Sequence, residues 1–145
     1  MAELHASIEI NRPTAEVFSY MIDADNLSKW MTELVEAKQT SPGPTGIGTN
    51  MNVVVSLLGR RIENVIKVTE FEKDAKFAIK SSSGPVINED EFTLEPIHGN
   101  TKVTRDTKVE LGGFFKMAEP LVVRQLNRQF ETNFANLKDL LESQP

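Results

Sequence analysis

The sequence has no cysteine and only two histidines, His5 and His98, among its 145 residues. Without cysteine the chain has no disulfide, no thiolate nucleophile and no cysteine-ligated zinc site. Two histidines far apart in the sequence also argue against a histidine-rich metal centre, so we expect neither a metal ion nor a cofactor. A chain without cysteine suits a reducing compartment, and we expect a cytoplasmic protein.

Long apolar runs and basic clusters are also missing. No run approaches the roughly 20 apolar residues of a membrane-spanning helix, and the first ten residues lack the basic and apolar regions of a secretory signal. Lys and Arg number 16 against 21 for Asp and Glu, which gives a net charge of -5. A nucleic-acid partner needs a basic stripe. We therefore expect no nucleic-acid binding and no stable membrane insertion.

What the chain does have is an ordinary globular composition, with 39% hydrophobic and 26% charged residues. A chain of this length corresponds to one domain, over residues 1–145. Apolar and polar residues alternate from Leu4 to Ile10, which predicts a strand that turns His5 toward solvent. Pro13 is suited to the first turn of a helix, and residues 23–26 have the composition of a turn and cap before a second short helix that ends at Trp30.

The middle of the chain predicts strands joined by short turns. The predicted strands cover residues 34–40, 51–58, 61–71, 76–82, 86–95 and 102–111. The turns between them include the Pro- and Gly-rich segments 41–48, 83–85 and 96–100. Because parallel neighbours need long crossover connections, these short turns predict an antiparallel sheet of seven strands. The register of residues 51–58 stays open, since Met51, Val53, Val55 and Leu57 compete with Val54 and Leu58 for the inner face.

The last segment, residues 114–142, predicts a long amphipathic helix. Its apolar stripe includes Phe115, Leu126, Phe130 and Phe134, at helical spacing. Pro120 has two interpretations: it bends one continuous helix, or the regular helix begins there after a lead-in turn.

The order of elements predicts an α+β fold in which the sheet curls around the terminal helix. An antiparallel sheet of this length twists, and the helix can bury its stripe only against the concave face. A curled sheet does not close tightly along a helix, so we expect an apolar cavity between them. Such cavities bind small, mostly apolar ligands.

Residues 8–30, IEINRPTAEVFSYMIDADNLSKW, followed by Gly46 and Gly48, resemble the START-related (SRPBCC) superfamily, which includes birch-pollen-allergen-like proteins. Within it, the chain is most similar to the bacterial polyketide cyclase/dehydrase-like group. The resemblance covers the whole chain in element order. It implies a helix-grip fold with a hydrophobic cavity. Members of this superfamily include lipid and quinone carriers, receptors, cyclases and activators of a chaperone ATPase, so the fold alone does not define the activity.

Polar residues that face the cavity are the most informative candidates, because a buried polar group costs free energy unless it is paired or binds something. Alternation places Arg105 on the inner face, and hairpin pairing brings Asp90 to a diagonal position. Arg105, held by Asp90, would then present a donor to a ligand carboxylate, carbonyl or enolate. The alternative is a purely structural ion pair.

Two further polar side chains share the helix stripe with the phenylalanines. Asn133 either contacts a ligand or is satisfied by backbone or water, and Glu119 is a candidate base if the helix is continuous there. Trp30 either roofs the cavity or packs in the core. The full set of expected ligand contacts is Trp30, Val53, Val55, Ile66, Phe77, Asn88, Asp90, Phe92, Arg105, Phe115, Leu126, Phe130, Asn133 and Phe134.

Three functions follow from these expectations. The first is a carrier or sensor, monomeric or weakly dimeric, for a small hydrophobic molecule such as a lipid, polyketide, isoprenoid or quinone. The second is a polyketide cyclase/dehydrase-type enzyme with Arg105, Asp90 and Glu119 as candidate catalytic residues. The third is a protein-interaction module that resembles the chaperone-ATPase activators.

Overall fold

The computed structural model describes residues 2–81 and 85–144, so residues 83 and 84 of the predicted turn at 83–85 lie outside it, as does residue 82 of the predicted strand before it. The elements are β1 (Ala2–Ile10), α1 (Thr14–Ile22), α2 (Ala24–Trp30), β2 (Leu34–Gln39), β3 (Asn50–Leu57), β4 (Arg60–Glu72), β5 (Lys76–Ser81), β6 (Val86–Ile97), β7 (Asn100–Leu111), α3 (Gly113–Met117) and α4 (Glu119–Glu142). Their order agrees with the sequence prediction, and the α+β class is confirmed.

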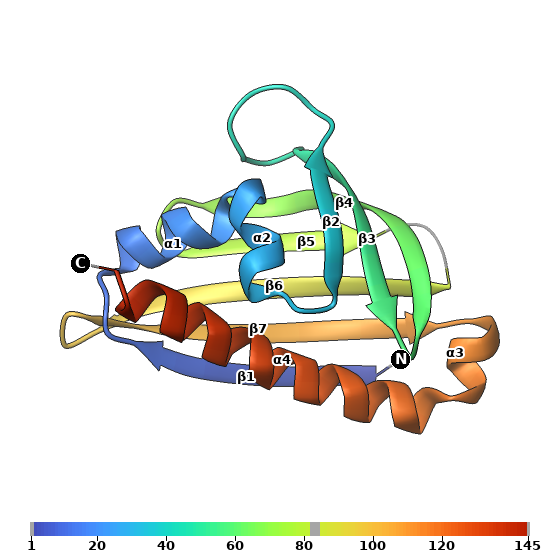
Figure 1. Ribbon diagram of the computed structural model, residues 1–145. Coiled ribbons are helices and arrows are strands. Elements are labelled where there is room, and N and C mark those ends of the chain that lie inside the picture. Colours follow the sequence, from blue (N-terminus) through green and yellow to red (C-terminus); the bar gives the residue numbers. More distant parts are fainter. Residues whose placement is uncertain (1, 82–84, 145) are drawn as a thin grey trace.

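Within the described residues, the strands form one antiparallel sheet in the order β1-β7-β6-β5-β4-β3-β2. The sheet curves, and α4 runs along its concave side beside β1 and β7 (Figure 1). Helices α1 and α2 lie over one part of the same side. This is the helix-grip arrangement that the element order and the resemblance both predict.

Period-two alternation explains the strand faces. On β7, Arg105 and Thr107 are buried, whereas Asp106 and Lys108 are exposed on the outer face. The exposed His5 of β1 donates from Nδ1 to Oδ1 of Asp106 across the strand pair, at 2.6 Å. The alternation therefore places one buried charged side chain, Arg105, on the concave face.

The C-terminal segment is not one continuous helix. It breaks at Ala118, whose backbone leaves the helical region with φ -98° and ψ 19°. The regular helix α4 begins at Glu119, with Pro120 in its first turn, where a missing N–H costs no intrahelical hydrogen bond. Pro120 therefore starts α4 and does not bend it, and α3 is the lead-in turn, formed as a short helix.

The β6–β7 connection is tighter than predicted. The strands continue to Ile97 and resume at Asn100, so the turn has two central residues, His98 and Gly99. Both have positive φ, 49° and 84°, which is the backbone of a type I′ hairpin turn. The predicted five-residue connection was too long because Pro96 lies inside β6, opposite Thr101.

The core is divided along the helix axis into two hydrophobic clusters. One cluster lies under α1 and α2 and includes Trp30, Phe92 and Phe134. The other lies at the opposite end of α4 and includes Phe115 and Phe130. Residues of both clusters face the space between the sheet and α4, where the candidate site lies.

Candidate functional site

A cavity of about 150 Å³ lies between the concave face of the sheet and α4, and residues of both core clusters contribute to its wall. Its lining is mostly aliphatic and aromatic. The apolar lining residues are Met21, Ile22, Leu27, Met31, Leu34, Met51, Val53, Val55, Leu57, Ile62, Ile66, Val68, Phe71, Phe77, Ile79, Val86, Phe92, Val109, Leu126 and Phe130. The expected cavity therefore exists.

Strand β3 supplies four of these residues, and this resolves the register that the sequence left open. Met51, Val53, Val55 and Leu57 all line the cavity. Val54 points to the opposite side, where it pairs with Glu36 of β2 and Glu63 of β4. The alternating set therefore faces inward.

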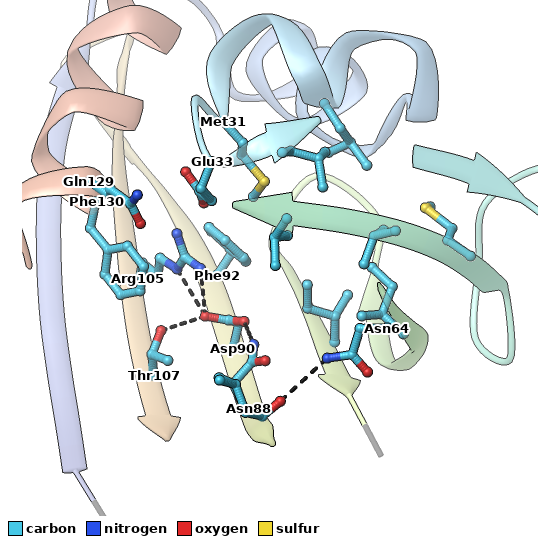
Figure 2. A pocket seen from close by; sticks show the side chains of 18 of the residues that line it. Met31, Glu33, Asn64, Asn88, Asp90, Phe92, Arg105, Thr107, Gln129 and Phe130 are labelled. Carbon is cyan, nitrogen blue, oxygen red and sulfur yellow. Dashed lines mark hydrogen bonds and ion pairs between the residues drawn. The ribbon is translucent and has the colours of Figure 1, made fainter. Parts of the chain in front are cut away.

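Asp90 is the centre of a buried polar network on β5, β6 and β7. Its side chain is 1% exposed. Oδ1 accepts from Arg105 Nε at 2.9 Å and Nη2 at 2.8 Å, and from the Thr107 hydroxyl at 2.5 Å. Oδ2 accepts from the amide of Asn88, which is itself held by Ser81. Both carboxylate oxygens thus accept hydrogen bonds from neighbouring strand residues, and Asp90 orients Arg105 (Figure 2).

The guanidinium group of Arg105 is held between two aromatic rings. Its Cζ lies 3.5 Å from the ring centroid of Phe130 and 5.0 Å from that of Phe92. Nε and Nη2 point to Asp90, but Nη1 is buried and has no hydrogen-bond partner. A buried donor without a partner costs about 1–3 kcal/mol, and a bound ligand or water that accepts from Nη1 would remove that cost.

A second polar group lies where α2 passes into β2. Asn133 of α4 is fully buried, and its amide nitrogen donates to both carboxyl oxygens of Glu33 at 3.1 and 3.0 Å. Its Oδ1 accepts from the backbone N–H of Thr32 at 3.0 Å. Asn133 therefore fixes Glu33, which lines the cavity. Gln129, one turn earlier on α4, also lines it, and Gln129 Oε1 is buried without a partner.

Ten of the expected ligand contacts lie on the cavity wall: Val53, Val55, Ile66, Phe77, Asn88, Asp90, Phe92, Arg105, Leu126 and Phe130. Four do not. Trp30 packs edge-on against Phe92 inside the core, and Asn133 is used to hold Glu33 and Thr32. Phe134 and Phe115 are buried in the two core clusters and do not line the cavity.

Glu119 is also placed differently from its role as a candidate base. It is the first residue of α4, lies outside the cavity lining, and contacts Lys116 at 3.5 Å. The break at Ala118 takes it off the inward stripe, which assumed a continuous helix. Both histidines are exposed. Among the described residues, Glu33 and Asp90 contribute the carboxyl groups of the lining.

Sequence reasoning missed Glu33, Gln129 and Thr107. Thr107 shares its strand face with Arg105, so strand alternation could have identified it. Gln129 directly precedes Phe130 on the inner side of α4, so helical spacing could have identified it. Glu33 follows the end of α2 outside any periodic segment. Its position comes from the hydrogen bonds of Asn133, which connect residues 100 apart in the chain.

Neither a metal centre nor a membrane-spanning helix is found in the described part of the chain. In residues 2–81 and 85–144, no group of three or more His, Asp or Glu side chains is arranged to hold a metal ion. Across the same residues, none of the helices combines the length and hydropathy of a membrane span.

The fold and cavity define a helix-grip protein with an apolar internal site, and comparisons agree with this class. The family model for "Polyketide cyclase / dehydrase and lipid transport" matches residues 1–142, so the chain belongs to that family. No curated protein matches the sequence significantly.

Solved structures share the fold at low sequence identity. The TTHA0849 protein of Thermus thermophilus superposes with a TM-score of 0.85 at 19% identity, over 99% of this chain and 100% of that one. A START superfamily protein of Mycobacterium smegmatis gives 0.78 at 15% identity, over 97% of each chain. The di-domain ARO/CYC BexL of the BE-7585A biosynthetic pathway gives 0.75 at 17% identity, over 98% of this chain and 47% of that one.

Proposed function

We propose that the protein binds and carries a small hydrophobic molecule inside the cavity between the sheet and α4. The observation that carries this proposal is a mostly apolar cavity that contains a buried, unpartnered guanidinium N–H, Arg105 Nη1. The apolar wall supplies the free energy of transfer from water, and Arg105 orients the one polar group of the guest. Membership of a family described by lipid transport as well as cyclase activity is consistent with this role.

The size of the cavity limits the guest. An apolar cavity of about 150 Å³ is enough for a benzene-sized molecule. The cavity here has a similar volume, about 150 Å³. Among lipids, polyketides, isoprenoids and quinones, a ring-sized molecule or the ring of a larger one therefore fits best.

The absence of cysteine from the sequence supports action in the cytoplasm. We also propose that the protein is a monomer or a weak homodimer.

A titration with ethylbenzene, followed by two-dimensional NMR of the backbone amides, tests the proposal. Ethylbenzene has no polar group, so it reports the apolar cavity alone. We expect saturable shifts at amides of cavity-lining residues. Val55→Phe fills the cavity and should weaken binding at least tenfold. Val35→Phe, at a residue of the neighbouring strand that is 55% exposed, is the matched control. The absence of saturable shifts in the wild-type protein would refute the proposal.

A cyclase/dehydrase-type reaction is the second candidate, favoured by the same Arg105. A donor in a dry pocket stabilises the oxyanion of an aldol-type ring closure. Asp90 accepts from Arg105 Nε and Nη2, from Thr107 and from Asn88. Among the described residues, the Glu33 carboxyl group accepts only from the Asn133 amide, so Glu33 is the better-placed proton acceptor. Glu33→Gln should then abolish turnover of a poly-β-ketone while ethylbenzene binding persists. Full turnover by this variant would remove Glu33 from the reaction.

A further inference from the structure

We infer that the cavity selects a neutral, oxygen-bearing guest, with a carbonyl or hydroxyl oxygen accepting from Arg105 Nη1, and that it excludes ionised carboxylates. This inference rests on the proposed binding function. A buried arginine ordinarily suggests a carboxylate ligand. Three observations at the polar end of this cavity argue for the opposite preference.

The first observation is charge balance. The Arg105 side chain is 6% exposed and the Asp90 side chain 1% exposed, and they lie 2.8 Å apart between Nη2 and Oδ1. The positive charge of Arg105 is therefore already matched inside the protein. A guest carboxylate would add a second buried negative charge with no countercharge of its own, and a buried uncompensated charge is strongly unfavourable.

The second observation concerns the groups near the free N–H. Arg105 lies between Asp90 on one side and Glu33 and Gln129 on the other (Figure 2). Glu33 contributes a carboxyl group, and Gln129 contributes a buried carbonyl oxygen without a partner. Each Glu33 oxygen accepts one hydrogen bond from the Asn133 amide and can accept a further one, and Gln129 Oε1 accepts none from the described residues. They would repel a carboxylate, whereas either can accept a hydrogen bond from a guest hydroxyl.

The third observation is that Arg105 has one free nitrogen, Nη1, within the described part of the chain, and that its guanidinium group is held in place by Asp90 and two aromatic rings. Nε and Nη2 are both used by Asp90, so Arg105 cannot form a two-pronged contact with a guest carboxylate without breaking its ion pair. The aromatic rings of Phe92 and Phe130 lie within 5.0 and 3.5 Å of Cζ, and the stack with Phe130 restrains rotation of the guanidinium plane. One N–H suits one carbonyl or hydroxyl oxygen, and a hydroxyl on the same guest would satisfy Gln129.

Four single-ring probes of similar size test this inference: ethylbenzene, acetophenone, 3-hydroxyacetophenone and benzoate, titrated into the full chain at pH 7 and followed by NMR. Wild-type protein should bind acetophenone at least tenfold more tightly than benzoate. The hydroxyl of 3-hydroxyacetophenone should add affinity that Gln129→Leu removes. The comparison of acetophenone with benzoate uses the wild-type protein alone and needs no variant that risks misfolding.

Arg105→Lys keeps the charge beside Asp90 but removes the forked donor. We expect it to weaken acetophenone binding about tenfold, which corresponds to the loss of one hydrogen bond to a charged group. Ethylbenzene makes no hydrogen bond to Arg105, so its binding should weaken by less than that of acetophenone. Arg128→Lys, at an exposed arginine of α4, is the control for the substitution itself.

The outcomes separate the two proposals. If ethylbenzene binds and benzoate binds as tightly as acetophenone, the neutral-guest inference is wrong and the cavity function stands. If acetophenone binding is insensitive to Arg105→Lys while ethylbenzene binds, the contact with Nη1 is wrong. If none of the four probes binds, the proposed function itself fails, and the inference with it.

Discussion

Asn133 of α4 donates to both carboxyl oxygens of Glu33, at 3.1 and 3.0 Å, although the two residues are 100 positions apart in the chain. The same amide accepts from the backbone of Thr32. One side chain thus fastens the start of β2 to the helix at the edge of the cavity. Asn133, one of the expected ligand contacts, therefore positions Glu33 and Thr32.

Asn133→Ala should therefore destabilise the fold. Asn133 is completely buried, and its removal leaves Glu33 without its two hydrogen bonds. We expect the free energy of unfolding to fall by about 1–3 kcal/mol, measured by urea denaturation. Asn127→Ala, at an exposed position of the same helix, should change it by less than about 0.5 kcal/mol. Equal effects of the two substitutions would contradict the assigned role.

The Arg105–Asp90 pair predicts strong energetic coupling. Removing one partner of a buried ion pair costs about 3–5 kcal/mol because the other charge stays buried. Arg105→Met and Asp90→Asn should each be severe, and the double variant should be much less destabilised than their sum. The exposed Lys80–Glu89 pair, 3.2 Å apart on neighbouring strands, is the control, with an expected coupling below about 1 kcal/mol. Denaturant titration of both cycles measures the difference.

The end of α4 predicts a pH dependence of stability. Hydrogen bonds from the Asn11 backbone N–H at 2.8 Å and from Lys138 at 2.7 Å lower the pKa of Glu142 below its ordinary 4.5. A carboxyl group whose pKa is lower in the folded than in the unfolded state stabilises the fold at pH values above its unfolded-state pKa. This stabilisation is lost as the pH falls through its folded-state pKa. Glu142→Gln should therefore destabilise the protein at pH 7, with the difference from wild type disappearing in acid. Thermal melts across pH 2–7 test the sign, and a constant difference would contradict it.

The β6–β7 turn predicts a stabilising substitution. His98 has φ 49°, in the left-handed region that Gly, Asn, Asp and His adopt more readily than other residues. Asn is preferred before Gly in a type I′ turn, so His98→Asn should raise the free energy of unfolding by up to about 1 kcal/mol. His98→Val should lower it, since a branched side chain is strained at positive φ. A thermal melt that ranks Val above Asn would refute this account of the turn.

The polar strand residues of the site were predictable because strand geometry is periodic. Alternation along β7 places Arg105 inward, and the β6–β7 register sets Asp90 opposite Thr107, diagonal to Arg105. The cavity boundaries were not predictable in the same way. A helical stripe tells which residues of α4 face inward, but not where along the axis the space ends. The boundaries depend on tertiary contacts between distant parts of the chain, such as the hydrogen bonds of Asn133 to Thr32 and Glu33, which no local pattern reveals.

The division of the site between sheet and helix has a consequence for altering its selectivity. The hydrogen bonds that fix Asp90 all come from strands β6 and β7, at Asn88, Arg105 and Thr107. Leu126 and Gln129 reach the same space from α4 and take no part in fixing Asp90. Leu126 and Gln129 can therefore be exchanged to reshape the guest pocket while the charged anchor stays in place, provided that Phe130, which packs on Arg105 from the same helix, is kept. A library confined to these two positions would vary what is recognised without rebuilding how it is held.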